Sequence, residues 1–134
     1  MTKLDSSLNL PPLELRTGSH PASVTEARKG VAAYAEAAGA NRRDVELAVA
    51  EAVSNAVVHA FVGRDNGVIT VRAELDGPNE LLVEVGDNGS GITTPARSPQ
   101  AGFGLPIIGA VTDSVEIHTG DRGTRLEMRF PRGS

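Results

Sequence analysis

Hydrophobic residues recur along the first forty positions with two different periods, which predict a strand followed by a helix. Residues 13–16 (Leu-Glu-Leu-Arg) alternate between apolar and polar side chains, as a half-exposed strand does. The next apolar residues follow at spacings of three and four, the spacing of one helix face. They are Val24, Ala27, Val31 and Tyr34. This pattern predicts a helix over about 21–38, which ends at Gly39.

A second helix is predicted from Asn41, whose side chain is a suitable N-terminal cap, to about Phe61. From Leu47 onward almost every residue of this segment is apolar. We therefore expect most of the surface of this helix to be buried.

Two β-hairpins and a short helix are predicted in the rest of the chain, where β-branched runs alternate with turn residues. The hairpin strands are 68–75 with 80–86 and 114–118 with 124–130, and a helix over about 105–111 separates the hairpins. Strands joined in hairpins favour an antiparallel or mixed sheet with the helices on one face. The predicted fold is therefore an α/β protein of the α+β two-layer sandwich type.

Composition and charge exclude several classes of function. The length of 134 residues suits one domain, and we expect a lead-in over 1–12 and a single domain over 13–134. A net charge of −4 and an aromatic content of 3% argue against direct binding of nucleic acid. The absence of cysteine excludes disulfides, thiol nucleophiles and Cys-ligated zinc. Without a membrane-spanning run or a signal-peptide pattern, the expected location is the cytoplasm.

Three polar residues interrupt the apolar run of the second predicted helix at intervals of four: Glu51, Asn55 and His59. Residues four apart lie on the same helix face, so the three side chains form one stripe. A buried carboxylate is costly unless it is paired, hydrated or near a metal. The stripe is therefore either a satisfied polar cluster at the edge of the helix or the wall of a pocket. In a pocket, Glu51 would be a base and Asn55 a ligand for a hard cation.

Two glycine-containing segments lie between the predicted hairpins. Asp87-Asn-Gly-Ser-Gly91 directly follows the strand over 80–86, and is either a tight turn or part of a site. Gly102-Phe-Gly104-Leu precedes the short helix, and is either a hinge or a loop whose backbone N–H groups meet a phosphate. The chain has neither GxxxxGK[ST] nor GxGxxG within a strand–helix–strand unit, which excludes standard P-loop and Rossmann sites.

Taken together and in this order, the segments resemble the motifs of the Bergerat-fold ATPases. Glu51 to Phe61 resembles the N box, Asp87 to Gly91 the first glycine box, Gly102 to Leu105 the second, and Gly123-Thr124 the closing Gly-Thr. Within that superfamily the small size and the Glu-x-x-x-Asn-Ala-x-x-His helix most resemble the anti-sigma factor serine/threonine kinases. The resemblance covers roughly residues 13–130 and implies the Bergerat ATP-binding fold, with a mixed, mostly antiparallel sheet.

The resemblance also implies a role for each motif. Asn55 would bind Mg²⁺, and Glu51 would activate the hydroxyl of a partner serine or a water molecule. Asp87 would accept a hydrogen bond from the adenine amino group, with Thr124 in support. The other implied cofactor-binding positions are glycines that would lie close to the nucleotide: Gly89, Gly91, Gly102 and Gly104.

The implied function is that of an ATP-binding anti-sigma factor that phosphorylates a serine of an antagonist protein and sequesters a sigma factor. Its cofactors would be ATP or ADP and Mg²⁺, and a homodimer is typical of the family. One departure concerns residues 92–101, a segment shorter than the ATP lid of the family's kinases. The alternative is therefore a nucleotide-binding partner-switch module with little or no kinase activity. A histidine kinase is disfavoured, because the chain leaves no room for a dimerising helical hairpin.

Overall fold

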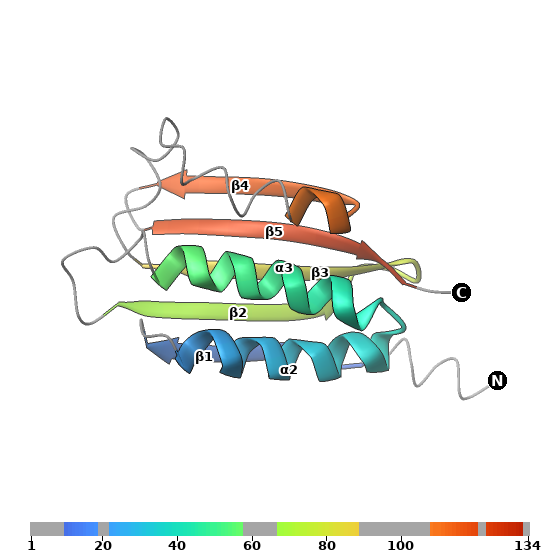
Figure 1. Ribbon diagram of the computed structural model, residues 1–134. Helices are drawn as coiled ribbons and strands as arrows, with labels where there is room; N and C mark the ends of the chain where they lie inside the picture. The colour runs from blue at the N-terminus through green and yellow to red at the C-terminus, as the bar shows by residue number, and fades with distance from the viewer. Residues whose placement is uncertain (1–9, 19–21, 58–66, 89–107, 121–122, 133–134) are drawn as a thin grey trace.

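A computed structural model places the predicted elements in two layers, with both long helices on one side of a single sheet (Figure 1). The structure describes residues 10–18, 22–57, 67–88, 108–120 and 123–132. Its elements are β1 (Leu13–Gly18), α2 (Ala22–Ala38), α3 (Arg42–Asn55), β2 (Val68–Leu75), β3 (Glu80–Asp87), β4 (Ser114–Gly120) and β5 (Gly123–Pro131). Residues 108–111 are also helical, and the start of the helix predicted over 105–111 lies outside the described residues.

The sheet has the strand order β1-β2-β3-β5-β4, and each of its four pairings is antiparallel. The two predicted hairpins are therefore confirmed, and β5 lies between β3 and β4. The predicted α+β two-layer sandwich is confirmed as well, with no parallel pair among the described strands. The long helices contact the strands on one side of the sheet, α2 on β1 and β2 and α3 on β3.

Helix α2 ends at the predicted glycine and lies close to β1. Gly39 follows its last residue with φ of 81°, a left-handed conformation that glycine adopts without steric cost. The helix lies so close to β1 that a Cβ on Gly30 would come within 2.8 Å of the Cδ1 atom of Leu15. A larger residue at position 30 would therefore require the end of the Leu15 side chain to shift.

Helix α3 begins at the predicted cap. The Asn41 side chain accepts a hydrogen bond from the backbone N–H of Asp44 at 3.0 Å. Residues 48–55 are all buried or half-buried, in line with the expectation that most of this surface is buried, whereas Leu47 at the start of the apolar run is 43% exposed. The reason is that α3 belongs to an outer layer, and none of the described elements lies on its side away from the sheet. The α-helix ends at Asn55, residues 56–57 continue it in π-helical form, and the predicted end at Phe61 lies outside the described residues.

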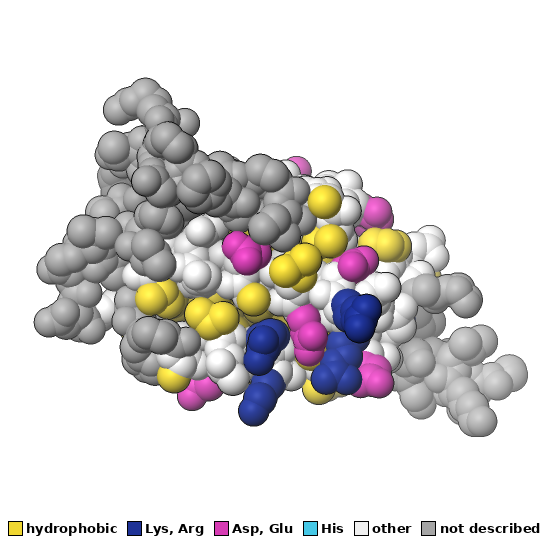
Figure 2. Space-filling model, in the orientation of Figure 1, with side chains coloured by type: hydrophobic (Ala, Val, Ile, Leu, Met, Phe, Trp, Pro, Cys, Tyr) yellow, Lys and Arg dark blue, Asp and Glu magenta, His cyan; other side chains and the backbone are white. Residues whose placement is uncertain are grey.

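The hydrophobic core lies between the helices and the sheet. Its fully buried side chains come from both layers and include Val31, Val45, Val49, Ile69, Val83, Met128 and Phe130. The outer surface of the helix layer carries basic and acidic side chains with separate hydrophobic ones between them (Figure 2). None of the described helices is long and apolar enough to cross a membrane.

The opposite face of the sheet, which we call the open face, is polar. On each strand the residues that alternate with the core positions point to this side. Pairing of the strands therefore forms rows of side chains across the open face. One row contains Glu14, Arg72, Glu84, Glu127 and Glu116, and the next contains Arg16, Thr70, Gly86, Arg125 and His118.

Candidate functional site

The candidate site lies at the end of the sheet where β3 ends and β5 begins. Asp87 is the last residue of β3 and pairs directly with Thr124, the second residue of β5. Each lies two positions from a core residue on its strand, Val85 and Leu126, so both side chains face the helix layer. Thr124 is only 6% exposed, and Asp87 is half-buried. The pairing brings together two residues that are far apart in the sequence.

Gly123 allows this close pairing. Its φ is 125°, a backbone conformation that residues with a side chain rarely adopt. A Cβ at this position would come within 1.9 Å of the Asp87 carbonyl oxygen and 3.0 Å of the Asn88 Cα atom. Position 123 therefore requires glycine, because the start of β5 runs directly against the end of β3.

The other side of Asp87 is held by β2. Asp87 pairs with Ile69 across that ladder. One residue further on, the side-chain oxygen of Asn88 accepts a hydrogen bond from the Val68 N–H at 2.8 Å. The Asn88 N–H in turn donates to the Val68 carbonyl oxygen at 3.3 Å. Asp87 is thus held between two strands, β2 and β5.

Helix α3 supplies the other described residues of the candidate site. Asn55 is its last residue, and Glu51 lies one turn earlier on the same helix face. Both side chains are half-buried. Figure 1 shows that α3 runs toward the end of the sheet where β3 ends and β5 begins. The end of α3 with Asn55 and the strand ends with Asp87 and Thr124 therefore lie at the same end of the two-layer structure.

The remaining predicted site residues lie outside the described residues. They are the four glycines Gly89, Gly91, Gly102 and Gly104, together with His59 of the polar stripe. Their roles stay predictions. The structure thus pairs Asp87 with Thr124 and places Glu51 and Asn55 on one helix face. Sequence reasoning placed Gly123 in the closing Gly-Thr and Asn88 in the first glycine box but gave neither a role of its own, although a glycine before a strand and an Asn after one are signals of close backbone contacts.

The described residues offer a specific set of chemical groups. A carboxylate and a hydroxyl beside the apolar core suit the polar edge of a flat heterocycle, whose faces would contact hydrophobic side chains. An amide oxygen and a carboxylate on one helix face are suitable ligands for a hard divalent cation. This combination, on a two-layer α+β scaffold, suits a nucleotide that binds together with a metal ion.

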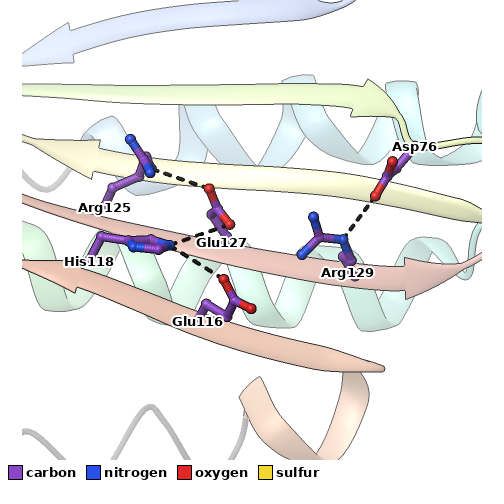
Figure 3. A network of polar contacts seen from close by, with 6 residues as sticks. All are labelled: Asp76, Glu116, His118, Arg125, Glu127 and Arg129. Carbon is purple, nitrogen blue, oxygen red and sulfur yellow. Dashed lines mark hydrogen bonds and ion pairs between the residues drawn. The ribbon is translucent and has the colours of Figure 1, made fainter.

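A second polar cluster lies on the open face, behind the sheet as seen from the helices. Figure 3 shows His118 beside Glu116 and Glu127, with its Nε2 atom 3.5 Å from an oxygen of each. The Nε atom of Arg125 is 3.4 Å from the other Glu127 oxygen. Near the opposite end of the same face, Arg129 contacts Asp76 at 2.9 Å. Sequence reasoning missed this cluster, although its members lie on the two strands of a predicted hairpin. The signal was the register of that hairpin, which places Glu116 opposite Glu127 and His118 opposite Arg125.

Two carboxyl groups of this face affect each other directly. Glu84 and Glu127 are cross-strand partners. Burial raises the pKa of Glu84, and the hydrogen bond and the repulsion between its carboxyl group and Glu127 raise it further. Burial alone would raise the pKa of Glu127 as well, but the hydrogen bond from Glu84 and the attraction of His118 lower it overall. A proton in this pair is therefore held by Glu84, while Glu127 stays ionised.

Comparison with known proteins agrees with this architecture. A family model described as the histidine kinase-like ATPase domain matches residues 18–130. An anti-sigma F factor of Thermoanaerobacter sp. (strain X514) is 32% identical over 103 residues, which cover 68% of this chain and 71% of that protein. An anti-sigma F factor of Clostridium botulinum (strain Eklund 17B / Type B) is 30% identical over 99 residues, which cover 64% of this chain and 68% of that protein.

Two solved structures share the fold. The RsbU and RsbW domains of Rv1364c from Mycobacterium tuberculosis match 93% of this chain with a TM-score of 0.72 and 24% identity. The histidine kinase domain of the blue-light activated histidine kinase of Erythrobacter litoralis EL346 matches 68% of it with a TM-score of 0.59 and 28% identity. The matches span 34% and 44% of those longer chains. The chain therefore belongs to the histidine kinase-like ATPase domain family and, within it, resembles the anti-sigma factors.

Proposed function

We propose that this protein binds ATP or ADP at the end of the sheet beside α3. The observation that carries the proposal is the direct pairing of Asp87 with Thr124 on the helix-facing side, at the end of the molecule where α3 ends in Asn55. The Asp87 carboxylate would accept a hydrogen bond from the adenine amino group, and the Thr124 hydroxyl would support this edge of the base. Charge-assisted hydrogen bonds of this kind are stronger than neutral ones, which suits recognition of a base edge.

The chemistry of the α3 residues fits Mg²⁺. The Asn55 amide oxygen is a hard ligand, and the half-buried Glu51 carboxylate lies one turn away on the same face. Mg²⁺ binds proteins through one or two oxygen ligands and keeps water and phosphate oxygens for the rest of its shell. Bound there, the ion would neutralise charge on the phosphates, while Asn55 holds it and Glu51 remains available as a base.

We further propose that the bound ATP serves to phosphorylate a serine of an antagonist protein. The serine oxygen forms a bond to the γ-phosphorus, the bond to the bridging β–γ oxygen breaks, and ADP leaves. Glu51 accepts the proton of the serine hydroxyl. The similarity to proteins named anti-sigma F factor supports a sigma factor and an antagonist as partners. A cytoplasmic homodimer is part of the same proposal.

The test of the kinase step is the transfer of phosphate from labelled ATP to a small candidate antagonist protein. Glu51→Gln keeps the size of the side chain and removes the proton-accepting charge. The variant should bind ATP normally and lose transfer by roughly 10²–10⁴-fold, which is the usual value of general-base help. A matched control is Glu46→Gln on the same helix, where the carboxylate contacts Arg42 on the surface.

The second candidate function is a nucleotide-binding partner-switch module with little kinase activity. The observation that favours it is the short segment over 92–101 between the glycine boxes. In that case the wild type would bind ATP, hydrolyse it slowly and label no partner. Transfer at the wild-type rate in Glu51→Gln would instead remove Glu51 from the mechanism.

A further inference from the structure

A hollow of about 420 Å³ lies on the open face of the sheet, near the end that carries the candidate nucleotide site on its other side. The open-face residues that border it include Arg16, Thr70, Gly86, Asn88, His118 and Arg125. Asp87 and Thr124 also border the hollow, but their positions in the ladder direct their side chains to the helix layer. The hollow and the candidate nucleotide site therefore use opposite faces of the same strands.

The hollow exists because one position of a central strand has no side chain. Gly86 lies in β3 between Thr70 on β2 and Arg125 on β5, with Arg16 beyond Thr70 and His118 beyond Arg125. Its backbone does not require glycine, because an added Cβ would meet only the Thr124 carbonyl oxygen, at an ordinary 3.6 Å. Glycine inside a strand weakens the strand, and it often marks a place where a ligand approaches the backbone.

Long basic side chains stand on both sides of this gap. The backbones of Arg16 and Arg125 are three strand spacings apart, or about 14 Å, so two extended arginine side chains can reach toward a ligand above Gly86. Arg125 is bound on one side by Glu127. None of the ion pairs between described residues involves Arg16, so its guanidinium is not engaged by a neighbouring carboxylate within that part of the chain.

The donors around the gap match an anion with several charged oxygens. Guanidinium groups bind phosphate through paired hydrogen bonds, and this geometry gives them a preference for phosphate. Thr70 adds a hydroxyl donor, and the Asn88 side chain keeps its NH₂ group because its oxygen already accepts from Val68. His118 contributes an imidazole at the far rim, where Figure 3 shows it close to Arg125 and Glu127.

We propose that the hollow over Gly86 binds a small phosphate anion, held between Arg16 and Arg125, and that this site is separate from the nucleotide site. A volume of about 420 Å³ falls within the range of ordinary small-molecule sites. A tetrahedral phosphate offers oxygens to donors on both sides of β3, whereas a planar carboxylate offers two oxygens in one plane. Pyrophosphate fits best, because its two phosphate groups can meet one arginine each.

The test is an NMR titration of the ¹⁵N-labelled protein with pyrophosphate at low ionic strength and without Mg²⁺. The backbone amide signals of Thr70, Gly86 and Arg125 should shift and saturate. Arg16→Gln should weaken binding by roughly tenfold or more, because a hydrogen bond to a charged group is worth about 1.5–3 kcal/mol. Gly86→Val should abolish binding by filling the gap, and valine is favoured in strands.

Arg72→Gln is the matched control, since it makes the same change of charge on the same face. Arg72 contacts Glu14 at 2.7 Å and Glu74 at 2.9 Å and does not border the hollow. The Arg72→Gln variant should bind pyrophosphate within about twofold of the wild-type affinity, as expected when the removed surface charge lies outside the site. An equal loss of affinity in Arg72→Gln and Arg16→Gln would show a general charge effect and overturn the proposal.

Further outcomes test the site itself and distinguish it from the nucleotide site. Unchanged binding by a folded Gly86→Val variant would overturn the proposal, and Arg16→Gln carries the test if the valine variant does not fold. Absence of shifts at Thr70 and Gly86 with millimolar pyrophosphate would overturn it as well. Adenosine, which has no phosphate, should leave these two signals in place. Shifts there with ATP but not with pyrophosphate would mean that the open face only responds to the nucleotide site.

Discussion

Asp87 and Thr124 stand directly opposite each other in the ladder between β3 and β5, with both side chains on the helix-facing side. Gly123 makes this arrangement possible, because its missing side chain lets β5 start against the Asp87 carbonyl oxygen. The carboxylate is thereby placed beside a nearly buried hydroxyl at the edge of the core. In such surroundings an ionised acceptor gives a strong and directional hydrogen bond to a ligand.

We expect Asp87→Asn to weaken the binding of ATP and ADP by roughly ten- to a hundredfold. The asparagine keeps the size of the side chain, but it replaces a charged acceptor with a neutral one, and such hydrogen bonds are worth about 1.5–3 kcal/mol. Calorimetry with Mg²⁺ measures the loss. Asp76→Asn is the control, since Asp76 contacts Arg129 at the opposite end of β2. Similar affinity in both variants and the wild type would contradict a role for Asp87 in binding adenine.

Gly123→Ala should destabilise the folded protein much more than Gly86→Ala. The new Cβ at position 123 would lie 1.9 Å from the Asp87 carbonyl oxygen, and φ there is 125°. Backbone strain of this kind costs on the order of 1–3 kcal/mol before the overlap is relieved. At position 86 the Cβ makes an ordinary contact at 3.6 Å. Urea denaturation of both variants gives the comparison, and equal stability would mean that β5 starts elsewhere.

The local elements of this fold could be predicted from the sequence because their signals are local. The Asn41 cap and Gly39 act within one turn of the chain, and both were confirmed. The apolar run from Leu47 predicted a mostly buried helix surface, but it did not show that Leu47 itself would be exposed, because an apolar run does not tell which residues other elements cover. The roles of Glu51 and Asn55 rest on resemblance and remain predictions.

The open-face hollow could not be predicted in this way. The hollow is bordered by Arg16, Gly86 and Arg125, which lie in one row across the sheet. They share this row only because β5 lies between β3 and β4 and β1 pairs with β2. That strand order is set by packing over long sequence distances. Alternation along each strand predicts which side chains share a face, but not which strands are neighbours. The same limit applies to Asp87 and Thr124, whose pairing follows from the position of β5 beside β3.

Glu84→Gln should make the protein more stable at neutral pH and leave its stability nearly unchanged in acid. The pKa of Glu84 is raised, by burial first and then by Glu127, so the folded state holds this proton more tightly than the unfolded chain. As pH rises above the ordinary glutamate value of 4.5, the wild type therefore loses stability while Glu84 ionises. Glutamine stays neutral and can still donate a hydrogen bond to Glu127.

The expected gain is a few tenths to about 1 kcal/mol, the usual size of a cross-strand pair interaction. It should develop between pH 4.5 and the raised pKa of Glu84 and stay constant above that range. Glu127, whose pKa is lowered, acts in the opposite sense. Its ionised carboxylate stabilises the folded protein at neutral pH, and this stabilisation is lost in acid as the group takes up a proton. Urea denaturation across this pH range measures both effects. A variant less stable than wild type at pH 8 would mean that the two carboxyl groups do not repel each other.

Asn55→Ala should separate the metal-dependent part of nucleotide binding from the recognition of adenine. Asn55 is the last residue of α3, and its half-buried amide would hold Mg²⁺ against the phosphates. The variant should therefore lose the increase in ATP affinity that Mg²⁺ gives, while it binds adenosine about as well as the wild type does. Calorimetry with both ligands, with and without Mg²⁺, measures this difference. The neighbouring half-buried Ser54 offers a control, because Ser54→Ala removes a polar group from the same turn without removing the amide. Equal losses for adenosine and ATP in Asn55→Ala would show that Asn55 supports the end of the helix rather than the metal ion.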